Sequence, residues 1–294
     1  MRFGFPLKEK IAFYWVYFAS KVFCLWFEVK RPKLRMFIYE ILYSAYKFID
    51  RNSLLPSPFK TDYVETKFGK FRVRPGTVDM TNASPAFERR DVDYLLGLVS
   101  GLAARQRRIL FLDIGADIGT FAVTVGNRFK GYEGLHIMAF EPAESSFGLL
   151  THNVNLNGLS PKVQLCNFAL FSEDGRELEF QFNIGAPGSS GLRFAAQAGF
   201  ETQRVTARTL DAVLKDRASD YDDIIFKMDV EGVESEVLKG SQQALDSGRD
   251  IYLLIEDFVN PEIITYLEGM GAEFMAKLTP YNSFWRYRKP VNPR

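Results

Sequence analysis

A chain of 294 residues, of which 47% are hydrophobic and 25% charged, is long enough for one large domain with an appendage and a sizeable core. Its net charge of +1 argues against bulk attraction to nucleic acid, so we expect no nucleic-acid partner. Two cysteines and two histidines exclude a disulfide framework and a histidine-rich zinc site, and leave His136 and His152 open as catalytic bases.

The N-terminal segment, residues 1–55, differs from the rest of the chain in charge and aromatic content. Its first 50 residues hold nine Lys or Arg against four Asp or Glu. Residues 11–27 are apolar around almost the whole helical circumference, but a helix of this length spans about 25 Å, short of a hydrocarbon core of about 30 Å. Flanking basic residues favour a helix in the headgroup region of an anionic membrane.

A helical cap that packs on the rest of the chain or on a second subunit is the alternative for this segment. We therefore expect a cytoplasmic protein, with peripheral contact to the inner face of the cytoplasmic membrane through residues 1–50 and a homo-oligomer as the two open alternatives. A second helical stretch follows at residues 36–49, and Pro56 and Pro58 mark a linker.

From residue 60 onwards we expect one domain, residues 60–294. It opens with a small β-hairpin at residues 63–73, which alternates about Gly69, and a helix at 87–102. Strands are then predicted at 109–114, 135–140, 163–170, 224–228 and 251–255, and helices at 121–129, 145–156, 233–245 and 262–270. An inserted antiparallel pair is expected at 178–182 and 204–207, and closing strands at 272–276 and 283–287.

Strands that alternate with helices in this way predict an α/β fold with a doubly wound, mostly parallel, Rossmann-like seven-stranded sheet. The N-terminal helices would form an appendage to it. In such a sheet ligands bind at the carboxyl ends of the strands, and every polar cluster of this chain falls at such an end.

The first polar cluster, DIGADIG at residues 113–119, follows the first core strand. Glycine at such a turn lets the backbone approach a ligand closely, and acidic side chains hold hydroxyl or amine groups. A dinucleotide site favours G-x-G-x-x-G, with a helix N-terminus facing a pyrophosphate. Because Asp113 and Asp117 would place negative charge there, the turn favours a cationic, phosphate-free cofactor over a nicotinamide dinucleotide.

Two more clusters follow at neighbouring strand ends. Glu141 lies 22 residues after Gly119, where a carboxylate accepts hydrogen bonds from ribose hydroxyls. The string KMDVEGVE at residues 227–234 combines a lysine with several carboxylates. Such groups are costly to desolvate unless they bind something, so we expect them to line a ligand site.

Five strings occur in a fixed order: FLDIGADIGTFAV, AFEP, NVNLNG, FALFSEDG and FKMDVEGVESEVLKG. On these strings residues 63–288 resemble the FkbM-type methyltransferases. One departure is Asp117, at a position that the family usually fills with Asn. The resemblance implies a class I methyltransferase fold and O-methylation dependent on S-adenosyl-L-methionine, usually of sugar hydroxyls in surface glycans or of natural-product scaffolds.

Carried over by position, the resemblance also implies site residues. Those expected to hold the cofactor are Asp113, Gly115, Ala116, Asp117, Gly119 and Glu141, with Phe168 and Ala169 flanking the adenine. Those expected at the reaction centre are Asp229, Lys227, Glu231 and Glu256. A carboxylate is the favoured base for the acceptor's proton, because a neutral lysine requires a strongly lowered pKa.

A metal site is a further hypothesis. Asp229, Glu256 and Asp257 would offer an oxygen-rich site for Mg²⁺, which binds vicinal hydroxyls and lowers the pKa of the acceptor. The alternative is that Glu256 only orients the substrate and that Asp257 is solvated.

The stretch at residues 185–199 is rich in small residues and is predicted to form a lid between the inserted strands. Ser189 and Ser190 are expected to contact acceptor hydroxyls, and Arg193 an acidic group on the acceptor. A linker without a ligand role is the alternative.

These patterns predict an O-methyltransferase that acts on a sugar hydroxyl of a surface glycan or of a lipid-linked glycan precursor. A diffusible natural product as the acceptor, and a cofactor-binding module without turnover, are the alternatives. A nicotinamide oxidoreductase is disfavoured by the acids of the first turn.

Overall fold

The computed structural model describes residues 37–38, 40–41, 43, 62–192, 196, 198–258 and 260–289, apart from the side chain of residue 216. The expectations for residues 11–27, for the linker at Pro56 and Pro58 and for Arg193 lie outside these residues. Of the helix predicted at 36–49, the described positions are helical. Within the described ranges, no helix is long and apolar enough to cross a lipid bilayer.

A seven-stranded sheet forms the centre of the molecule, with the strand order β11-β12-β10-β9-β3-β4-β5. Its strands are β3 (Ile109–Ile114), β4 (Leu135–Phe140), β5 (Val163–Cys166), β9 (Asp223–Met228), β10 (Asp250–Glu256), β11 (Glu273–Lys277) and β12 (Asn282–Tyr287). Only β12 runs against the others, between β10 and β11. Every residue of β3 and β9 is buried, as expected for central parallel strands covered on both faces. The predicted fold class is confirmed.

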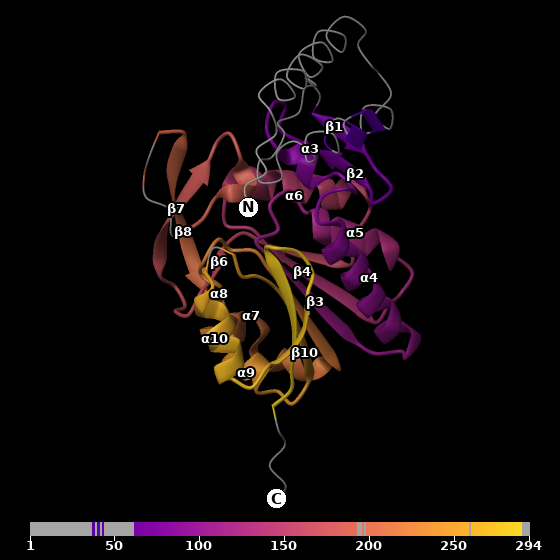
Figure 1. Ribbon diagram of the computed structural model, residues 1–294, viewed down its shortest axis with the longest axis vertical. Coiled ribbons are helices and arrows are strands. Elements are labelled where there is room, and N and C mark those ends of the chain that lie inside the picture. Colours follow the sequence, from indigo (N-terminus) through magenta and orange to yellow (C-terminus); the bar gives the residue numbers. More distant parts are fainter. Residues whose placement is uncertain are drawn as a thin grey trace, which may run out of the picture.

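Helices cover both faces of this sheet, and Figure 1 shows α4 and α5 on one side of it and α8, α9 and α10 on the other. One face packs on α4 (Arg89–Ala104), α5 (Thr120–Arg128) and α6 (Glu144–Leu156), and the other on α7 (Leu210–Leu214), α8 (Glu234–Lys239), α9 (Gln242–Leu245) and α10 (Glu262–Gly269). Alternate residues of β3 supply the two cores: Ile109 and Phe111 face α4, whereas Leu110 and Leu112 face α7.

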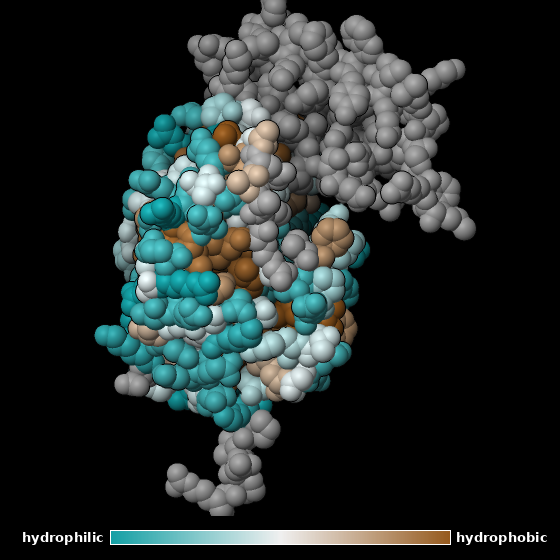
Figure 2. Space-filling model, turned by 90° about the vertical axis from the view of Figure 1, so that its left-hand side faces the viewer, coloured by the Kyte–Doolittle hydropathy of each residue, from teal (hydrophilic) through white to brown (hydrophobic). Residues whose placement is uncertain are grey.

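Most large apolar side chains of the described chain therefore lie inside these two layers. Figure 2 shows one face of the molecule, which is hydrophilic over most of its area and gathers apolar side chains near its middle. The exceptions among the large apolar residues include Phe258, Phe274 and Met275, which are exposed.

The smaller predicted elements are also present. β1 (Tyr63–Glu65) and β2 (Lys70–Arg72) form the antiparallel hairpin about Gly69. The inserted strands β7 (Glu177–Asn183) and β8 (Phe200–Arg208) pair antiparallel in a separate three-stranded sheet. The short elements α3 (Asp79–Asn82), η1 (Pro187–Ser189) and η2 (Lys215–Asp220) complete the described chain.

Two elements predicted as continuous are divided. The strand predicted at 163–170 ends at Cys166, and β6 (Ala169–Leu170) instead joins the inserted sheet beside β8. Asn167 turns the chain there, because its side-chain amide donates to the carbonyl of Glu141 at 2.9 Å. The helix predicted at 233–245 is divided into α8 and α9. Gly240, between them, lies so close to Phe171 that a Cβ would come within 2.0 Å of its carbonyl oxygen.

Candidate active site

A cavity of about 530 Å³ lies where β3, β4, β9 and β10 end. Its wall joins residues that lie far apart in the sequence, and two sides can be distinguished. The turn side consists of Gly115, Ala116, Asp117, Glu141, Phe168 and Ala169. The carboxyl side consists of Glu88, Lys227, Asp229, Glu231 and Glu256.

Gly115 is fixed on the turn side by the close approach of another strand. Its backbone φ is +76°, and a Cβ atom there would lie 1.9 Å from the carbonyl oxygen of Asp229. The amides of Gly115 and Ala116 donate to the carbonyl of Phe140 at 3.1 and 2.9 Å. A side chain at position 115 would therefore push apart the exits of β3 and β9.

Asp113 and Gly119 belong to the same turn but are not among the residues that line the cavity. Asp113 is fully buried, and its Oδ2 accepts a hydrogen bond from the amide of Ala122 in α5 at 2.8 Å. Gly119 precedes α5 with φ +87°, and a Cβ there would lie 2.6 Å from Cδ1 of Leu150. Both residues therefore shape the turn from behind the wall, whereas the sequence analysis expected them to hold the cofactor.

Asp117 is on the wall, but its charge is paired. Its Oδ1 accepts a hydrogen bond from Nη2 of Arg74 at 2.9 Å, and its Oδ2 accepts one from Asn82 at 3.2 Å. Nε of Arg74 also donates to the buried Asp79 at 2.7 Å. Since Asp113 faces a lysine as well, the turn carries less excess negative charge than its acid count indicates.

Glu141 places a buried carboxyl at the end of β4. Its Oε2 accepts a hydrogen bond from the amide of Asp117 at 2.9 Å, and its Oε1 accepts one from the amide of Ala143 at 2.8 Å. Burial, and then the charge of Asp117, raise the pKa of Glu141 to about 8. Two backbone donors thus fix this carboxyl on the wall, where a ligand with paired hydroxyls can add further hydrogen bonds.

The rest of the turn side is apolar. Phe168 packs edge-on against Phe140, with 5.8 Å between the ring centroids, and the guanidinium of Arg208 lies 5.3 Å from its ring centroid. Ala169 continues the wall beside Phe168. A planar ring can stack on this surface next to the Glu141 carboxyl.

Lys227 links the two sides of the cavity. Its Nζ lies 3.5 Å from Asp229 and 3.9 Å from Asp113, donates to the carbonyl of Gly115 at 3.3 Å, and lies 5.0 Å from the ring centroid of Phe121. Burial alone would lower the pKa of Lys227, but the carboxylates of Asp229 and Asp113 raise it above its usual value. Lys227 therefore stays protonated and is unsuited to act as a base.

Three carboxyl groups of the carboxyl side face one another. Asp229, Glu231 and Glu256 each offer an oxygen within 4.8 Å of the others. Burial and then Asp229 raise the pKa of Glu231 to about 8. The same two causes and a hydrogen bond to Asp229 raise that of Glu256 to about 11. Glu256 thus holds a proton at neutral pH.

Asp257 is the one residue of the predicted metal site that lies elsewhere. It is buried, its carboxylate pairs with Lys277, and its amide donates to the carbonyl of Tyr281 at 2.8 Å. Successive side chains at a strand end point to opposite faces, so Glu256 enters the cavity and Asp257 does not. Glu231 takes its place beside Asp229 and Glu256.

Ser189, the last residue of η1, and Ser190, which follows it, both lie on the wall. A Cβ at the neighbouring Gly188 would lie 3.0 Å from the amide of Asn82 and 3.8 Å from Asp117. The hydroxyl of Ser190 also accepts a hydrogen bond from the backbone of Asn183 at 2.8 Å. The expected contact of the two serines with acceptor hydroxyls stays a prediction.

Neither histidine lines the cavity. Nδ1 of His136 lies 3.1 Å from the hydroxyl of Tyr221, and His152 is exposed on α6. The site also holds residues that the sequence analysis did not select. Several of them come before β3: Tyr43, Asn82, Phe87 and Glu88 line the cavity, and Arg74 pairs with Asp117 behind its wall. An acid such as Glu88 at a helix start is common on surfaces, and nothing in its neighbourhood in the sequence marks it as a site residue.

The chain matches a known protein family. The family model described as the methyltransferase FkbM domain matches residues 113–274. That range holds most of the wall residues but not Glu88 or Tyr281. No curated protein matches the chain.

Three similar solved structures are methyltransferases by description. The FkbM methyltransferase of Methylobacillus flagellatus KT is 12% identical, with 60% of this chain and 42% of that chain covered and a TM-score of 0.39. An rRNA methylase of Streptococcus thermophilus is 12% identical, with 65% and 94% covered and a TM-score of 0.38. The Pyrococcus abyssi tRNA (uracil-54, C5)-methyltransferase in complex with S-adenosyl-L-homocysteine is 13% identical, with 78% and 45% covered and a TM-score of 0.40. The match spans less than half the length of the first and third of these proteins.

Proposed function

Because the chain belongs to the FkbM methyltransferase family, we propose that it transfers a methyl group from S-adenosyl-L-methionine to a hydroxyl of its acceptor. The observation that carries this proposal is the single cavity that joins the Gly115 turn and Glu141 to a cluster of carboxyl groups. One side suits a nucleoside, and the other suits a hydroxyl that must lose its proton.

The residues of the turn side fit the cofactor. Gly115 lies on the cavity wall without a side chain, Glu141 offers carboxyl oxygens to ribose hydroxyls, and Phe168 offers a ring face to the adenine. When bound, S-adenosyl-L-methionine supplies an electrophilic methyl group on a sulfonium centre. The ion pairs of Asp113 and Asp117 hold the turn in place without filling the cavity.

We assign removal of the acceptor's proton to Glu231. A base works best when its pKa lies near the working pH, and Glu231 is raised to that range while Glu256 holds its proton. Lys227 and the proton on Glu256 fix Asp229 between them, so Asp229 orients the acceptor hydroxyl. Protonated Lys227 also balances the negative charge that develops when Glu231 is ionised.

Mg²⁺ is the remaining part of this proposal, at Asp229, Glu231 and Glu256. Hard cations prefer oxygen ligands, and Oε2 of Glu256 is buried and makes no hydrogen bond within the described residues. A cation there would favour the ionised form of all three groups; without it, the proton of Glu256 offsets the same repulsion. Unchanged turnover when Mg²⁺ is added to EDTA-treated enzyme would remove the metal from the proposal.

We further propose a sugar hydroxyl of a surface or lipid-linked glycan precursor as the acceptor, with residues 1–50 holding the enzyme at the inner membrane face. The basic and aromatic composition of residues 1–50 supports the membrane contact. The test is sedimentation of the full chain with anionic phosphatidylglycerol vesicles and with neutral phosphatidylcholine vesicles. If the protein stayed in the supernatant equally with both kinds of vesicle, the result would favour a diffusible acceptor and a role of this segment in a homo-oligomer.

The activity is tested by incubating the full chain with methyl-labelled S-adenosyl-L-methionine and a lipid-linked sugar fraction. Label in the sugar is the expected result. Calorimetry with S-adenosylhomocysteine and with NAD distinguishes the two alternative functions. Binding of S-adenosylhomocysteine without label in any acceptor fraction would indicate a cofactor-binding module, and binding of NAD instead would indicate an oxidoreductase.

A further inference from the structure

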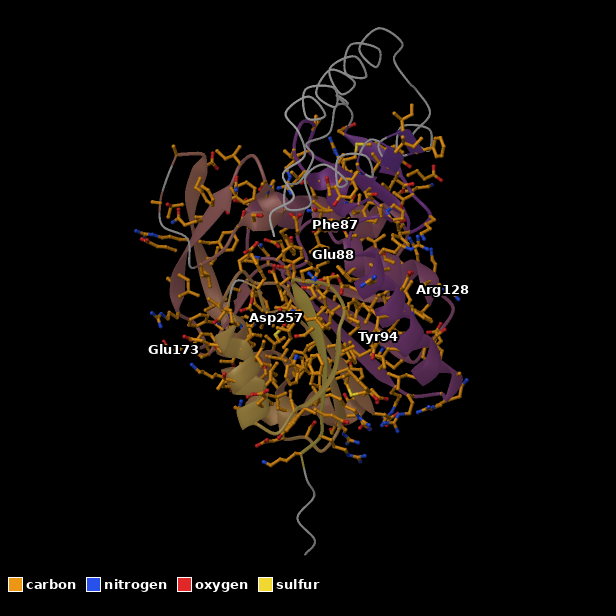
Figure 3. All side chains as sticks on the ribbon, viewed as in Figure 1. Phe87, Glu88, Tyr94, Arg128, Glu173 and Asp257 are labelled. Atoms are coloured by element: carbon orange, nitrogen blue, oxygen red, sulfur yellow. The ribbon has the colours of Figure 1, made fainter. Side chains whose placement is uncertain are left out.

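Glu88 is a wall residue that comes from outside the matched family domain. It directly precedes α4, and Figure 3 shows it beside Phe87 in the middle of the molecule, whereas Arg128 and Glu173 lie on opposite flanks. Both Glu88 and Phe87 line the cavity. The chain segment before β3 therefore closes the carboxyl side.

The backbone at Glu88 is held in a conformation that few such residues adopt. Its φ is +44°, in the left-handed region. The turn before it is closed by the amide of Phe87, which donates to the carbonyl of Ser84 at 3.0 Å, and α4 begins with the amide of Val92 donating to Glu88 at 3.0 Å. Local strain of this kind persists where tertiary packing fixes it, and it gathers at ligand sites.

The side chain of Glu88 is only weakly held. Asn282 donates to Asp91 at 3.0 Å but reaches Oε1 of Glu88 at 3.5 Å, the limit for a hydrogen bond. This is the one hydrogen bond of the Glu88 carboxyl within the described residues. The carboxyl therefore retains most of its hydrogen-bonding capacity for a ligand in the cavity.

Carboxyl groups predominate among the charged groups near Glu88. Asp229, Glu231 and Glu256 line the same cavity, and Lys227 is the one basic residue among its described wall residues. An anionic ligand would be repelled by these carboxyls, whereas the hydroxyls of an uncharged ligand can donate hydrogen bonds to them.

Aromatic side chains stand next to this group of carboxyls. Phe258, which is exposed, and Tyr281 form an edge-to-face pair with 5.1 Å between their centroids, and both line the cavity. Tyr43 lies on the same wall as Glu88 and Tyr281. Burial, and then the charges of these two residues, raise the pKa of Tyr43 above its usual value. Ring faces beside hydroxyl-binding groups suit a sugar ring, which has apolar C–H faces and polar edges.

We infer that the region between Glu88, Glu256 and Phe258 is the acceptor subsite, that it takes an uncharged polyhydroxylated ring, and that Glu88 hydrogen-bonds one of its hydroxyls. This inference rests on the proposed O-methylation of a sugar. It adds a binding residue from the N-terminal part of the chain and excludes acceptors with an anionic group beside the reacting hydroxyl.

Two amide variants test the role of Glu88. Glu88→Gln keeps the length of the side chain, and Glu88→Asn shortens it by one methylene but suits the left-handed backbone, so neither is expected to unfold. Asp93→Asn is the matched control, since Asp93 is exposed on the same helix and pairs with Arg89 at the surface. The half-saturating amount of the lipid-linked sugar fraction is measured for each, with S-adenosylhomocysteine calorimetry beside it.

We expect Glu88→Asn to raise the half-saturating amount by at least about tenfold, which is the loss of one buried hydrogen bond, and Glu88→Gln by about threefold. Asp93→Asn should match the wild type, and all three variants should bind S-adenosylhomocysteine as the wild type does. The role of Glu88 would be overturned if Glu88→Asn had the same half-saturating amount as the wild type, or if it lost S-adenosylhomocysteine binding. Either result would leave the proposed function standing. A wild-type enzyme that labels no sugar fraction overturns the proposed function, and the subsite with it.

Phe258→Ala gives an independent check of the same subsite. Phe258 is exposed, so its removal should leave the stability unchanged while raising the half-saturating amount several-fold. A neutral methyl hexoside should compete with the labelled fraction better than the corresponding uronic acid. Stronger competition by the uronic acid would contradict an uncharged acceptor.

Discussion

The turn side and the carboxyl side of the cavity are built from different kinds of interaction. On the turn side, backbone groups hold the ligand-facing atoms: two amides fix Glu141, and the approach of Asp229 fixes Gly115. On the carboxyl side, the side chains hold one another: Lys227 forms an ion pair with Asp229, and Asp229 shares a hydrogen bond with Glu256.

Because of this difference, we expect the turn side to determine cofactor binding and the carboxyl side to determine the rate of the reaction. Where backbone groups form the site, most single side-chain substitutions should leave its shape unchanged, which suits the binding of one constant cofactor. A site of facing carboxyls depends on a balance of protons and charges, so single substitutions there should change the reaction more than the fold. The two sides should therefore respond differently to mutation.

The largest effect is expected from Glu231→Gln. If Glu231 removes the acceptor's proton, methyl transfer should fall by about 10²–10⁴-fold, while S-adenosylhomocysteine affinity stays unchanged. Because the base must be ionised, the wild-type rate should rise with pH up to about 8 and then level off. Glu173→Gln, on an exposed flank, is the control for both measurements.

Lys227→Met should have the next largest effect, and on stability as well as activity. It leaves the buried Asp113 and the nearby Asp229 without their cation, so we expect the free energy of unfolding to fall by about 3–5 kcal/mol in urea denaturation. Adding Asp113→Asn to Lys227→Met should restore part of this loss. An additive double variant would show that the two residues are not coupled.

Gly115→Ala should disrupt the turn side through its backbone. The new Cβ would overlap the carbonyl of Asp229, so S-adenosylhomocysteine affinity should fall more than about tenfold, and thermal stability with it. Gly175→Ala is a close control, because Gly175 has φ +75° but no atom within 4 Å of the added Cβ. If both variants lost the same stability and neither lost affinity, the contact with Asp229 would not matter.

The smallest effect concerns the proton of Glu141. Its raised pKa means that the protonated form is favoured in the folded protein, so its contribution to stability is lost as pH rises from its ordinary value of 4.5 through about 8. Ribose hydroxyls donate to the ionised form, so S-adenosylhomocysteine should bind more tightly as pH rises through 8 and release a proton. Calorimetry in two buffers measures that proton, and Glu141→Gln should abolish its release.

Much of the fold could be predicted from periodicity, because buried parallel strands such as β3 and β9 are continuous apolar runs. The divisions of the predicted strand 163–170 and helix 233–245 could not. They depend on the contacts of Asn167 and Gly240 with distant parts of the chain, which local propensity does not contain.

Some residues of the candidate site could also be predicted from the sequence, and others could not. Glycines and acidic residues at strand ends predicted Gly115, Glu141 and Asp229 as site residues, since the carboxyl ends of parallel strands lie at one edge of the sheet. The pattern could not tell which way a side chain turns, so Asp113 and Asp257 were expected on the wall and are buried behind it. Arg74 and Glu88 reach the site only through tertiary packing.

Arg74 has a consequence for engineering. It joins Asp79 to Asp117, so the guanidinium that balances the glycine turn comes from outside the matched residues 113–274. A chimera that grafts only that module onto another scaffold would carry Asp117 without its counter-ion. A recombination junction placed before residue 74 would keep the pair in one fragment.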